Sequence, residues 1–191
     1  DLAKYFSNVV LVLILHFAIT YFLLLRILAG LSPLGFFRDF YPVMAYAFST
    51  SSSSATLPIT LETLEKKMGI KKEVASFTAP LGATINMDGT AIMQGVATVF
   101  IAQAYSVDIG LGGYMMVILT ATMASIGTAG VPGVGLITLA LVLQQVGLPV
   151  EGIALIIGVD RLLDMLRTAI NVGGDATVAA IVAKSEGKLE Y

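Results

Sequence analysis

Residues 160–175 read DRLLDMLRTAINVGGD, inside a segment that is otherwise apolar enough to span a bilayer. A charge near the bilayer centre costs roughly 2.5–3.5 kcal/mol, so such residues are retained where they face protein, water, substrate or ions. The stretch therefore predicts a transport site, and the alternative is internal pairing of Asp160 or Asp164 with Arg161 or Arg167. The ionisable and polar side chains recur at helical spacing and share one face of a helix; they are Asp160, Asp164, Arg167, Thr168, Asn171 and Asp175.

The composition of the whole chain is that of an integral membrane protein. Of its 191 residues, 57% are hydrophobic, and the mean hydropathy is +0.88; soluble domains are about 45–50% apolar. A net charge of −2 without a basic stripe argues against nucleic acid as a partner, and the lack of cysteine excludes disulfides and thiolate metal sites. The first apolar stretch lacks a cleavage pattern and is expected to be a span rather than a signal peptide. Because the chain opens on Asp1 and enters this span almost at once, we expect it to be part of a longer protein.

The distribution of Lys and Arg between the apolar stretches predicts the topology. Basic residues flank or fill the gaps at 26–38 and 66–72 and follow the last stretch at 184–188, whereas the gaps at 106–113 and 147–151 contain none. By the positive-inside rule the basic gaps lie in the cytoplasm. The second apolar stretch then begins and ends inside, and the fourth begins and ends outside. Each is expected to enter the membrane and turn back.

The midpoints of these two stretches carry turn-forming sequences. One reads STSSSSATLP at 49–58 and the other GTAGVPGVG at 127–135. Ser and Thr hydroxyls cap free backbone groups, glycine adopts turn dihedrals, and proline cannot continue a helix from within. Irregular backbone at membrane depth must be buried in protein or line a cavity. We therefore expect the two tips to meet each other or a ligand.

Each re-entrant stretch is followed by a span that polar residues interrupt, first NMDGT at 86–90 and then the residues from Asp164 to Asp175. The predicted fold class is all-α integral membrane, with an inverted repeat of a re-entrant helical hairpin plus a broken transmembrane helix. This arrangement is typical of secondary transporters with a site at the membrane midplane. The expected elements of this transport core are a span at 5–30, a re-entrant hairpin at 33–68, a broken span at 73–105, a re-entrant hairpin at 112–147 and a broken span at 150–185.

The interruption at 86–90 also predicts a cation site. Hard cations such as Na⁺ take oxygen ligands, and an unwound segment adds carbonyl groups to side-chain oxygens. His16 is isolated on the first span and is expected only to pack there, which disfavours a divalent metal. Gln94 and Gln103 are expected to satisfy local hydrogen bonds. The residues that could together hold one or two monovalent ions are Asn86, Asp88, Asn171 and Asp175.

Four motifs of this chain resemble those of one family, the dicarboxylate/amino acid:cation symporters, which are glutamate and aspartate transporters. The motifs are SSSATLP at 52–58, GATINMDGT at 82–90, ASIGTAGVPG at 124–133, and DMLRT followed by NVGGD within 164–175. They occur in the family's order over nearly the whole chain. The chain is similar to the sixth span, first hairpin, seventh span, second hairpin and eighth span of the family. The resemblance implies that the earlier spans, which include a trimeric scaffold, lie outside this chain.

The resemblance implies a site for an acidic amino acid. Arg167 would pair with the side-chain carboxylate of the substrate, which fits the guanidinium fork. Asp164 would hold the α-amino group, and the second hairpin would form the outer gate. The remaining substrate-binding residues would be Ser52, Ser53, Thr90, Val131, Gly135, Thr168 and Asn171.

Sites for Na⁺ as the coupling ion are implied as well, with no prosthetic cofactor. A first Na⁺ would use Gly82, Asn86, Asn171 and Asp175. A second would use carbonyl groups around Thr84, Ser125, Ile126 and Thr128. A third would use Asn86 and Asp88 together with residues of an early span outside this chain.

Some positions depart from the family pattern. Family members carry an arginine either in the serine run of the first hairpin or directly after the residue equivalent to Asp164, where this chain has Ser51 and Met165. Arg161, one turn earlier, could substitute. Relatives that also move a proton carry a glutamate at the position of Gln94, so proton coupling through that position is disfavoured.

The sequence thus predicts a Na⁺-coupled symporter of L-glutamate or L-aspartate in the cell membrane, not an enzyme, working by alternating access as a homotrimer. The alternative is an H⁺-coupled glutamate/dicarboxylate symporter. Two other classes remain. An ion channel also uses re-entrant tips and buried charges. An intramembrane aspartyl protease would use a site such as Gly173-Gly174-Asp175, but it would leave Arg167 and both hairpins unexplained.

Overall fold

The computed structural model describes residues 1–191, and the chain is helical almost throughout. The only β contact is an isolated antiparallel bridge between Ile70 and Leu189. The all-α class predicted from the sequence is confirmed.

The first predicted span is a single run of helix with two wider turns. The run Leu2–Ala29 contains an 18-residue stretch with a mean hydropathy of 2.4, so by length and composition it could cross a membrane. It ends at Gly30, whose φ of 68° favours glycine. Its parts are α1 (Leu2–His16), the π-helical turn η1 (Phe17–Tyr21), α2 (Phe22–Leu24) and a second π-helical turn η2 (Leu25–Ala29).

Two helical hairpins occupy the segments predicted to turn back. The first consists of α3 (Pro33–Thr50) and α4 (Ser53–Lys66), and the second of α7 (Gly110–Ser125) and α8 (Val134–Gln145). The first turns at Ser51, where φ is 52°, and the Ser52 side chain then caps α4 by accepting a hydrogen bond from the Ala55 N–H. The second returns at Gly133, where φ is 81°. Serine and glycine thus make the two turns, as their sequences predict.

A break divides the helical segment that follows the first hairpin. Helix α5 (Lys72–Ile85) ends at Asn86, and α6 (Asp88–Ala104) begins after Met87. Neither Asn86 nor Met87 has helical dihedrals, with ψ values of 73° and 42°. The interruption predicted within NMDGT is therefore present.

The last segment differs from the prediction. A 3-10 helix, η3 (Val150–Leu155), precedes α9 (Ile157–Ser185), and α9 continues without a break through Asp164–Asp175. The polar residues therefore interrupt the run of apolar side chains but not the helical backbone. Within the helix, the Thr168 and Thr177 hydroxyls donate to carbonyls one turn back.

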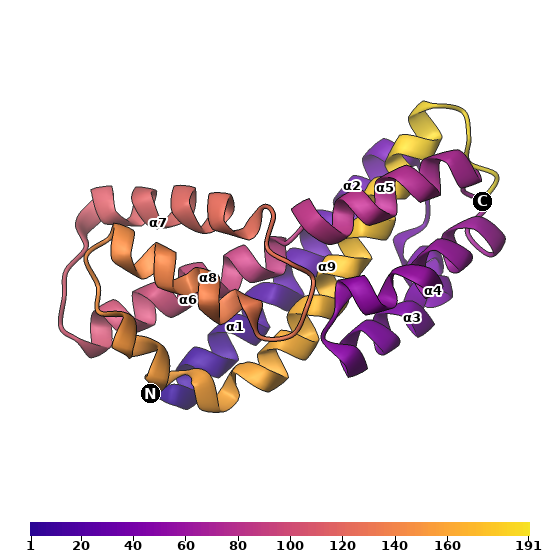
Figure 1. Ribbon diagram of the computed structural model, residues 1–191. Helices are drawn as coiled ribbons and strands as arrows, with labels where there is room; N and C mark the ends of the chain where they lie inside the picture. Colours follow the sequence, from indigo (N-terminus) through magenta and orange to yellow (C-terminus); the bar gives the residue numbers. More distant parts are fainter.

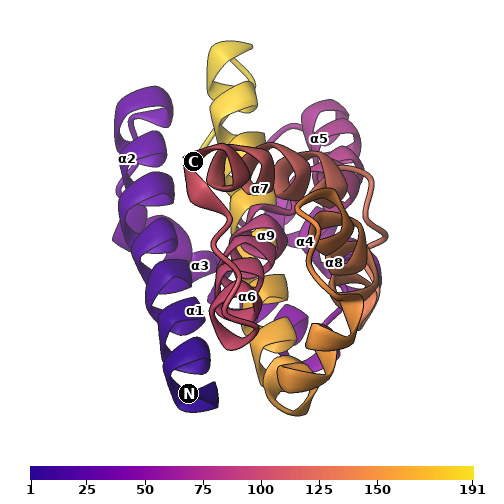
Figure 2. The ribbon, with the colours of Figure 1, turned by 90° about the vertical axis from the view of Figure 1, so that its left-hand side faces the viewer.

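The helices form an elongated body in which the two hairpins lie toward opposite ends and their tips approach near the middle (Figure 1). Helix α9 packs against α3 and α5. Seen from the end of the body that carries α7, α9 and α6 lie among the other helices (Figure 2). The site is therefore expected where the tips, the break before α6 and the middle of α9 come together.

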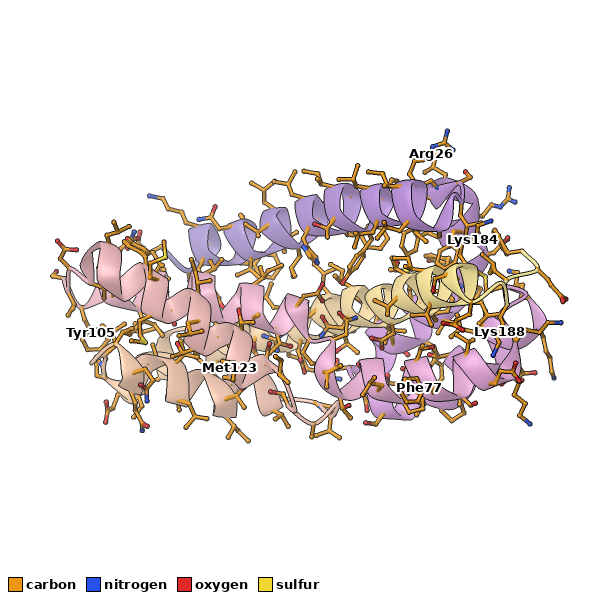
Figure 3. All side chains as sticks on the ribbon, turned by 90° about the horizontal axis from the view of Figure 1, so that it is seen from above. Arg26, Phe77, Tyr105, Met123, Lys184 and Lys188 are labelled. Atoms are coloured by element: carbon orange, nitrogen blue, oxygen red, sulfur yellow. The ribbon has the colours of Figure 1, made fainter.

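Basic side chains gather at one end of the body. Figure 3 shows Arg26, Lys184 and Lys188 at that end and Tyr105 at the other. Here the C-terminal segment pairs with the turn between α4 and α5, since the Lys71 N–H donates to the Lys188 carbonyl at 3.1 Å. The gathering of these basic residues at one end is what the distribution of Lys and Arg predicts.

Candidate functional site

The two hairpin tips touch each other. The hydroxyl of Ser52 donates to the Gly130 carbonyl at 2.7 Å, and the Ser54 N–H donates to the same oxygen at 3.1 Å. The Gly127 N–H donates to the Thr84 carbonyl at 2.9 Å. A Cβ on Gly130 would lie 3.1 Å from the Ala83 carbonyl, so glycine allows the close approach. The predicted meeting of the tips is confirmed.

The polar face of α9 is buried behind these tips. Arg167 is only 1% exposed, and its guanidinium forms ion pairs with Asp160 at 3.0 Å and Asp164 at 2.7 Å. The second oxygen of Asp164 accepts a hydrogen bond from the Gly133 N–H at 3.0 Å. Asp164 therefore links α9 to the tip of the second hairpin, and the internal pairing of Arg167 is present within the predicted site.

A small cavity lies between the tips, the start of α6 and α9. Its volume is about 20 Å³, which is room for about one water molecule. Seven of the predicted substrate-binding residues line it: Ser53, Thr90, Val131, Gly135, Asp164, Thr168 and Asn171. The sequence did not single out Met87 or Ala129, which also line it.

The other two predicted substrate-binding residues lie just outside the cavity wall. Ser52 joins the two tips, as described above. Arg167 lies behind Gly135, where an added Cβ would be 3.2 Å from its Nη2 atom. Gly135 therefore separates the guanidinium from the cavity.

A cluster of oxygen-bearing groups lies beside the cavity. The Asn86 amide donates to Asp175 Oδ1 at 2.8 Å and to the Asn171 carbonyl at 3.1 Å. A Cβ on Gly82 would be 2.5 Å from the same Asp175 oxygen. Asp175 is 3% exposed and has no basic partner. The structure therefore brings together the residues predicted for the first Na⁺ site.

The residues predicted for the second Na⁺ site lie at two helix ends that face each other. Thr84 is in the last turn of α5, and Ser125 ends α7. Ile126 and Thr128 follow α7, and the Thr128 N–H donates to the Ser125 carbonyl at 3.2 Å. Carbonyl groups at helix C-termini carry partial negative charge, which favours a cation.

Asp88 has partners that sequence reasoning missed. Asp88 Oδ2 lies 2.5 Å from His16 Nε2, and the Tyr21 hydroxyl donates to the same oxygen at 2.5 Å. The expectation that His16 only packs is therefore wrong, because Asp88 comes within reach of it in the folded chain. The two residues of this chain that are predicted for the third Na⁺ site are Asn86 and Asp88. They lie on either side of Met87, at the break before α6.

Gln94 and Arg161 also differ from expectation. The Gln94 side chain is fully buried and donates to the Thr138 hydroxyl at 2.7 Å, so it joins α6 to α8 instead of bonding locally. Arg161 is exposed and forms no ion pair, because its side chain leaves α9 away from the row. It lies outside the cavity that the predicted substrate-binding residues line.

Known proteins resemble the chain over nearly its whole length. An excitatory amino acid transporter of Caenorhabditis elegans is 48% identical over 181 residues, covering 95% of this chain and 36% of that protein. Human excitatory amino acid transporter 2 is 45% identical over 189 residues, covering 97% of this chain and 33% of that protein. Rat excitatory amino acid transporter 1 is 46% identical over 182 residues, which cover 95% of this chain and 34% of that protein.

The chain thus spans about a third of the length of these relatives. Residues 1–185 match the sodium:dicarboxylate symporter family. With this match and the identities above, the chain belongs to the sodium:dicarboxylate symporter family, a family of membrane transporters.

Proposed function

We propose that this chain is the substrate- and cation-binding core of a Na⁺-coupled symporter for L-glutamate or L-aspartate. The names of its relatives, excitatory amino acid transporters, support an acidic amino acid as substrate. In this proposal both hairpins are re-entrant, the chain crosses a cell membrane several times, and helices outside this chain join three copies into a trimer. The predicted segments 5–30, 33–68, 73–105, 112–147 and 150–185 together form the mobile core.

The observation that carries the proposal is the ion pair between Asp164 and Arg167 beneath the tip of the second hairpin. An acidic amino acid offers one ammonium group and two carboxylates. Its ammonium can replace Arg167 at Asp164, and its side-chain carboxylate can replace Asp164 at Arg167, so both buried charges stay paired. A neutral amino acid brings no carboxylate to replace Asp164 at Arg167, so the guanidinium would keep only Asp160 as a partner.

The helix ends around the cavity support the remaining contacts. Helices α4 and α8 begin at the tips, and their N-terminal N–H groups suit the α-carboxylate of the substrate. The carbonyl groups of Thr84 and Ser125, together with Asp175, suit Na⁺. In the proposal, cations bind first at Asp88 and Asp175, and the anionic amino acid follows.

The size of the cavity supports a gate. About 20 Å³ is far below the roughly 300–1,000 Å³ of small-molecule sites, so an amino acid binds only when part of the wall moves. The second hairpin tip has few ties: Gly130 to Ser52 and Ser54, Gly127 to Thr84, and Gly133 to Asp164. In the proposal this tip opens to the outside, and alternating access follows from movement of the whole core.

Calorimetric titration of the intact transporter tests the proposal. Aspartate, glutamate, alanine and succinate are each titrated with and without Na⁺. We expect aspartate or glutamate to bind only with Na⁺, alanine not to bind, and succinate to bind weakly because it has no ammonium for Asp164. Binding of glutamate or succinate without Na⁺ that tightens as the pH is lowered would favour the H⁺-coupled alternative, and binding of alanine as tightly as aspartate would contradict the site.

A further inference from the structure

We propose that the π-helical turn η1 is a positioning device for Asp88. It places His16 and Tyr21 on one face of the first helix, so that both hold the same carboxylate oxygen. The inference rests on the proposed function, in which Asp88 takes part in cation binding. His16 and Tyr21 belong to none of the substrate or cation sites described above.

The π-helical turn brings the two side chains onto one face. Residues five apart in an α-helix point about 140° away from each other, because each turn holds 3.6 residues. A π-helix bonds each residue to the fifth along the chain and so stacks residues five apart; such turns are frequent at functional sites. His16 directly precedes η1 and Tyr21 ends it. Their rings meet edge to face, with centroids 4.9 Å apart.

Both side chains reach Oδ2 of Asp88, each at 2.5 Å. The other oxygen, Oδ1, accepts only the N–H of the neighbouring residue, Gly89, at 3.1 Å. The side-chain conformation of Asp88 is thus fixed from the first helix through one oxygen. The second oxygen stays at the N-terminus of α6, beside the break at Asn86.

Tyr21 also lies against the neighbouring cluster of oxygen-bearing groups. A Cβ on Gly174 would overlap the Tyr21 hydroxyl and lie 2.6 Å from the Asn86 amide nitrogen. Asn86 in turn donates to Asp175. The Tyr21 hydroxyl therefore lies between α9, the break at Asn86 and the Asp88 carboxylate. A cation bound near Asn86 and Asp88 would find the carboxylate already oriented, which raises affinity without a contact from Tyr21 to the ion.

The test measures the Na⁺ concentration that gives half-maximal binding of labelled aspartate by the intact transporter. Tyr21→Phe and His16→Leu each remove one hydrogen bond to a charged group, and we expect each to raise that concentration about tenfold. His16→Gln keeps an N–H donor and should recover most of the loss. Tyr114→Phe on α7 alters a tyrosine that is 43% exposed, and it should change nothing. Aspartate affinity at saturating Na⁺ should stay constant in all four variants.

A second measurement separates positioning from general damage. In the Asp88→Asn protein, Tyr21→Phe should shift the Na⁺ dependence less than about twofold, because its effect passes through the carboxylate. The inference is overturned if Tyr21→Phe and His16→Leu leave the Na⁺ dependence unchanged, or if Tyr21→Phe acts in full on Asp88→Asn. If the unmodified transporter itself shows no Na⁺-dependent aspartate binding, the proposed function fails and the inference fails with it.

Discussion

The hydroxyl of Ser52 donates a 2.7 Å hydrogen bond to the carbonyl of Gly130, and this contact joins the tips of two hairpins that lie 78 positions apart in the chain. Ser52 also accepts from the Ala55 N–H at 3.1 Å and so caps α4. A single side chain therefore both starts one helix and holds the opposite tip closed.

Ser52→Ala removes both roles. We expect it to lower the free energy of unfolding by about 1–2 kcal/mol, the combined effect of a lost cap and a lost hydrogen bond. The amides of residues 127–133 should also exchange hydrogen faster, because the second tip opens more often. Ser49→Ala is the matched control, since the Ser49 hydroxyl bonds only to the Tyr46 carbonyl at an exposed position. Unchanged exchange in Ser52→Ala would show that other contacts hold the tip.

Arg167→Lys keeps a positive charge but loses the guanidinium fork. One ammonium cannot satisfy Asp160 and a substrate carboxylate with the same geometry, so we expect aspartate affinity to fall at least about tenfold in calorimetric titration. Arg167→Ala should abolish binding and lower stability by about 3–5 kcal/mol, because it leaves two buried carboxylates without a partner. Arg161→Lys, at an exposed position of the same helix, should bind normally. Normal affinity in Arg167→Lys would remove this residue from the substrate site.

Gly82→Ala places a methyl group against a cation-binding carboxylate. The added Cβ would be 2.5 Å from Asp175 Oδ1, so either that side chain or α5 must shift. We expect Na⁺-dependent thermal stabilisation to be lost. Gly95→Ala is a matched helical control, because nothing lies within 4 Å of its Cβ position. It should keep the Na⁺ response and raise stability by up to about 1 kcal/mol. A normal Na⁺ response in Gly82→Ala would place the ion elsewhere.

The C-terminal segment forms a pH-dependent contact at the basic end of the body. The Tyr191 hydroxyl donates to Asp39 at 2.8 Å, and partial burial and this bond raise the pKa of Tyr191 from 10.0 to about 12. Because the pKa is raised on folding, the contact stabilises fully below about pH 10 and is lost as the pH rises through about 12.

The midpoint of thermal unfolding should therefore fall more steeply between these pH values in the unmodified protein than in Tyr191→Phe. Tyr41→Phe, at an exposed position of α3, should keep the steep dependence. Equal slopes in the unmodified protein and Tyr191→Phe would mean that the contact with Asp39 contributes nothing to stability.

The helical class, the turns at Ser51 and Gly133 and the break at Asn86 could be predicted because each depends on local chemistry. Apolar periodicity specifies helices, and serine and glycine specify where they end. Proline does not, because Pro42, Pro58 and Pro80 all lie inside helices. The common face of Asp160, Asp164 and Arg167 follows from helical spacing alone. Continuity of α9 could not be predicted, because it depends on where the partners of its polar side chains lie, and residues such as Asp160 and Arg167 find them within the helix itself.

The sequence by itself thus determined an all-helical membrane chain with two hairpins and a buried polar face. Only the tertiary structure decided which groups meet there: His16 and Tyr21 reach Asp88 across 72 and 67 positions, and Gln94 reaches Thr138 across 44. The reason is physical. Periodicity and turn residues act over a few positions, whereas hydrogen bonds between distant residues depend on how whole helices pack, and one side chain carries no local signal of a distant partner.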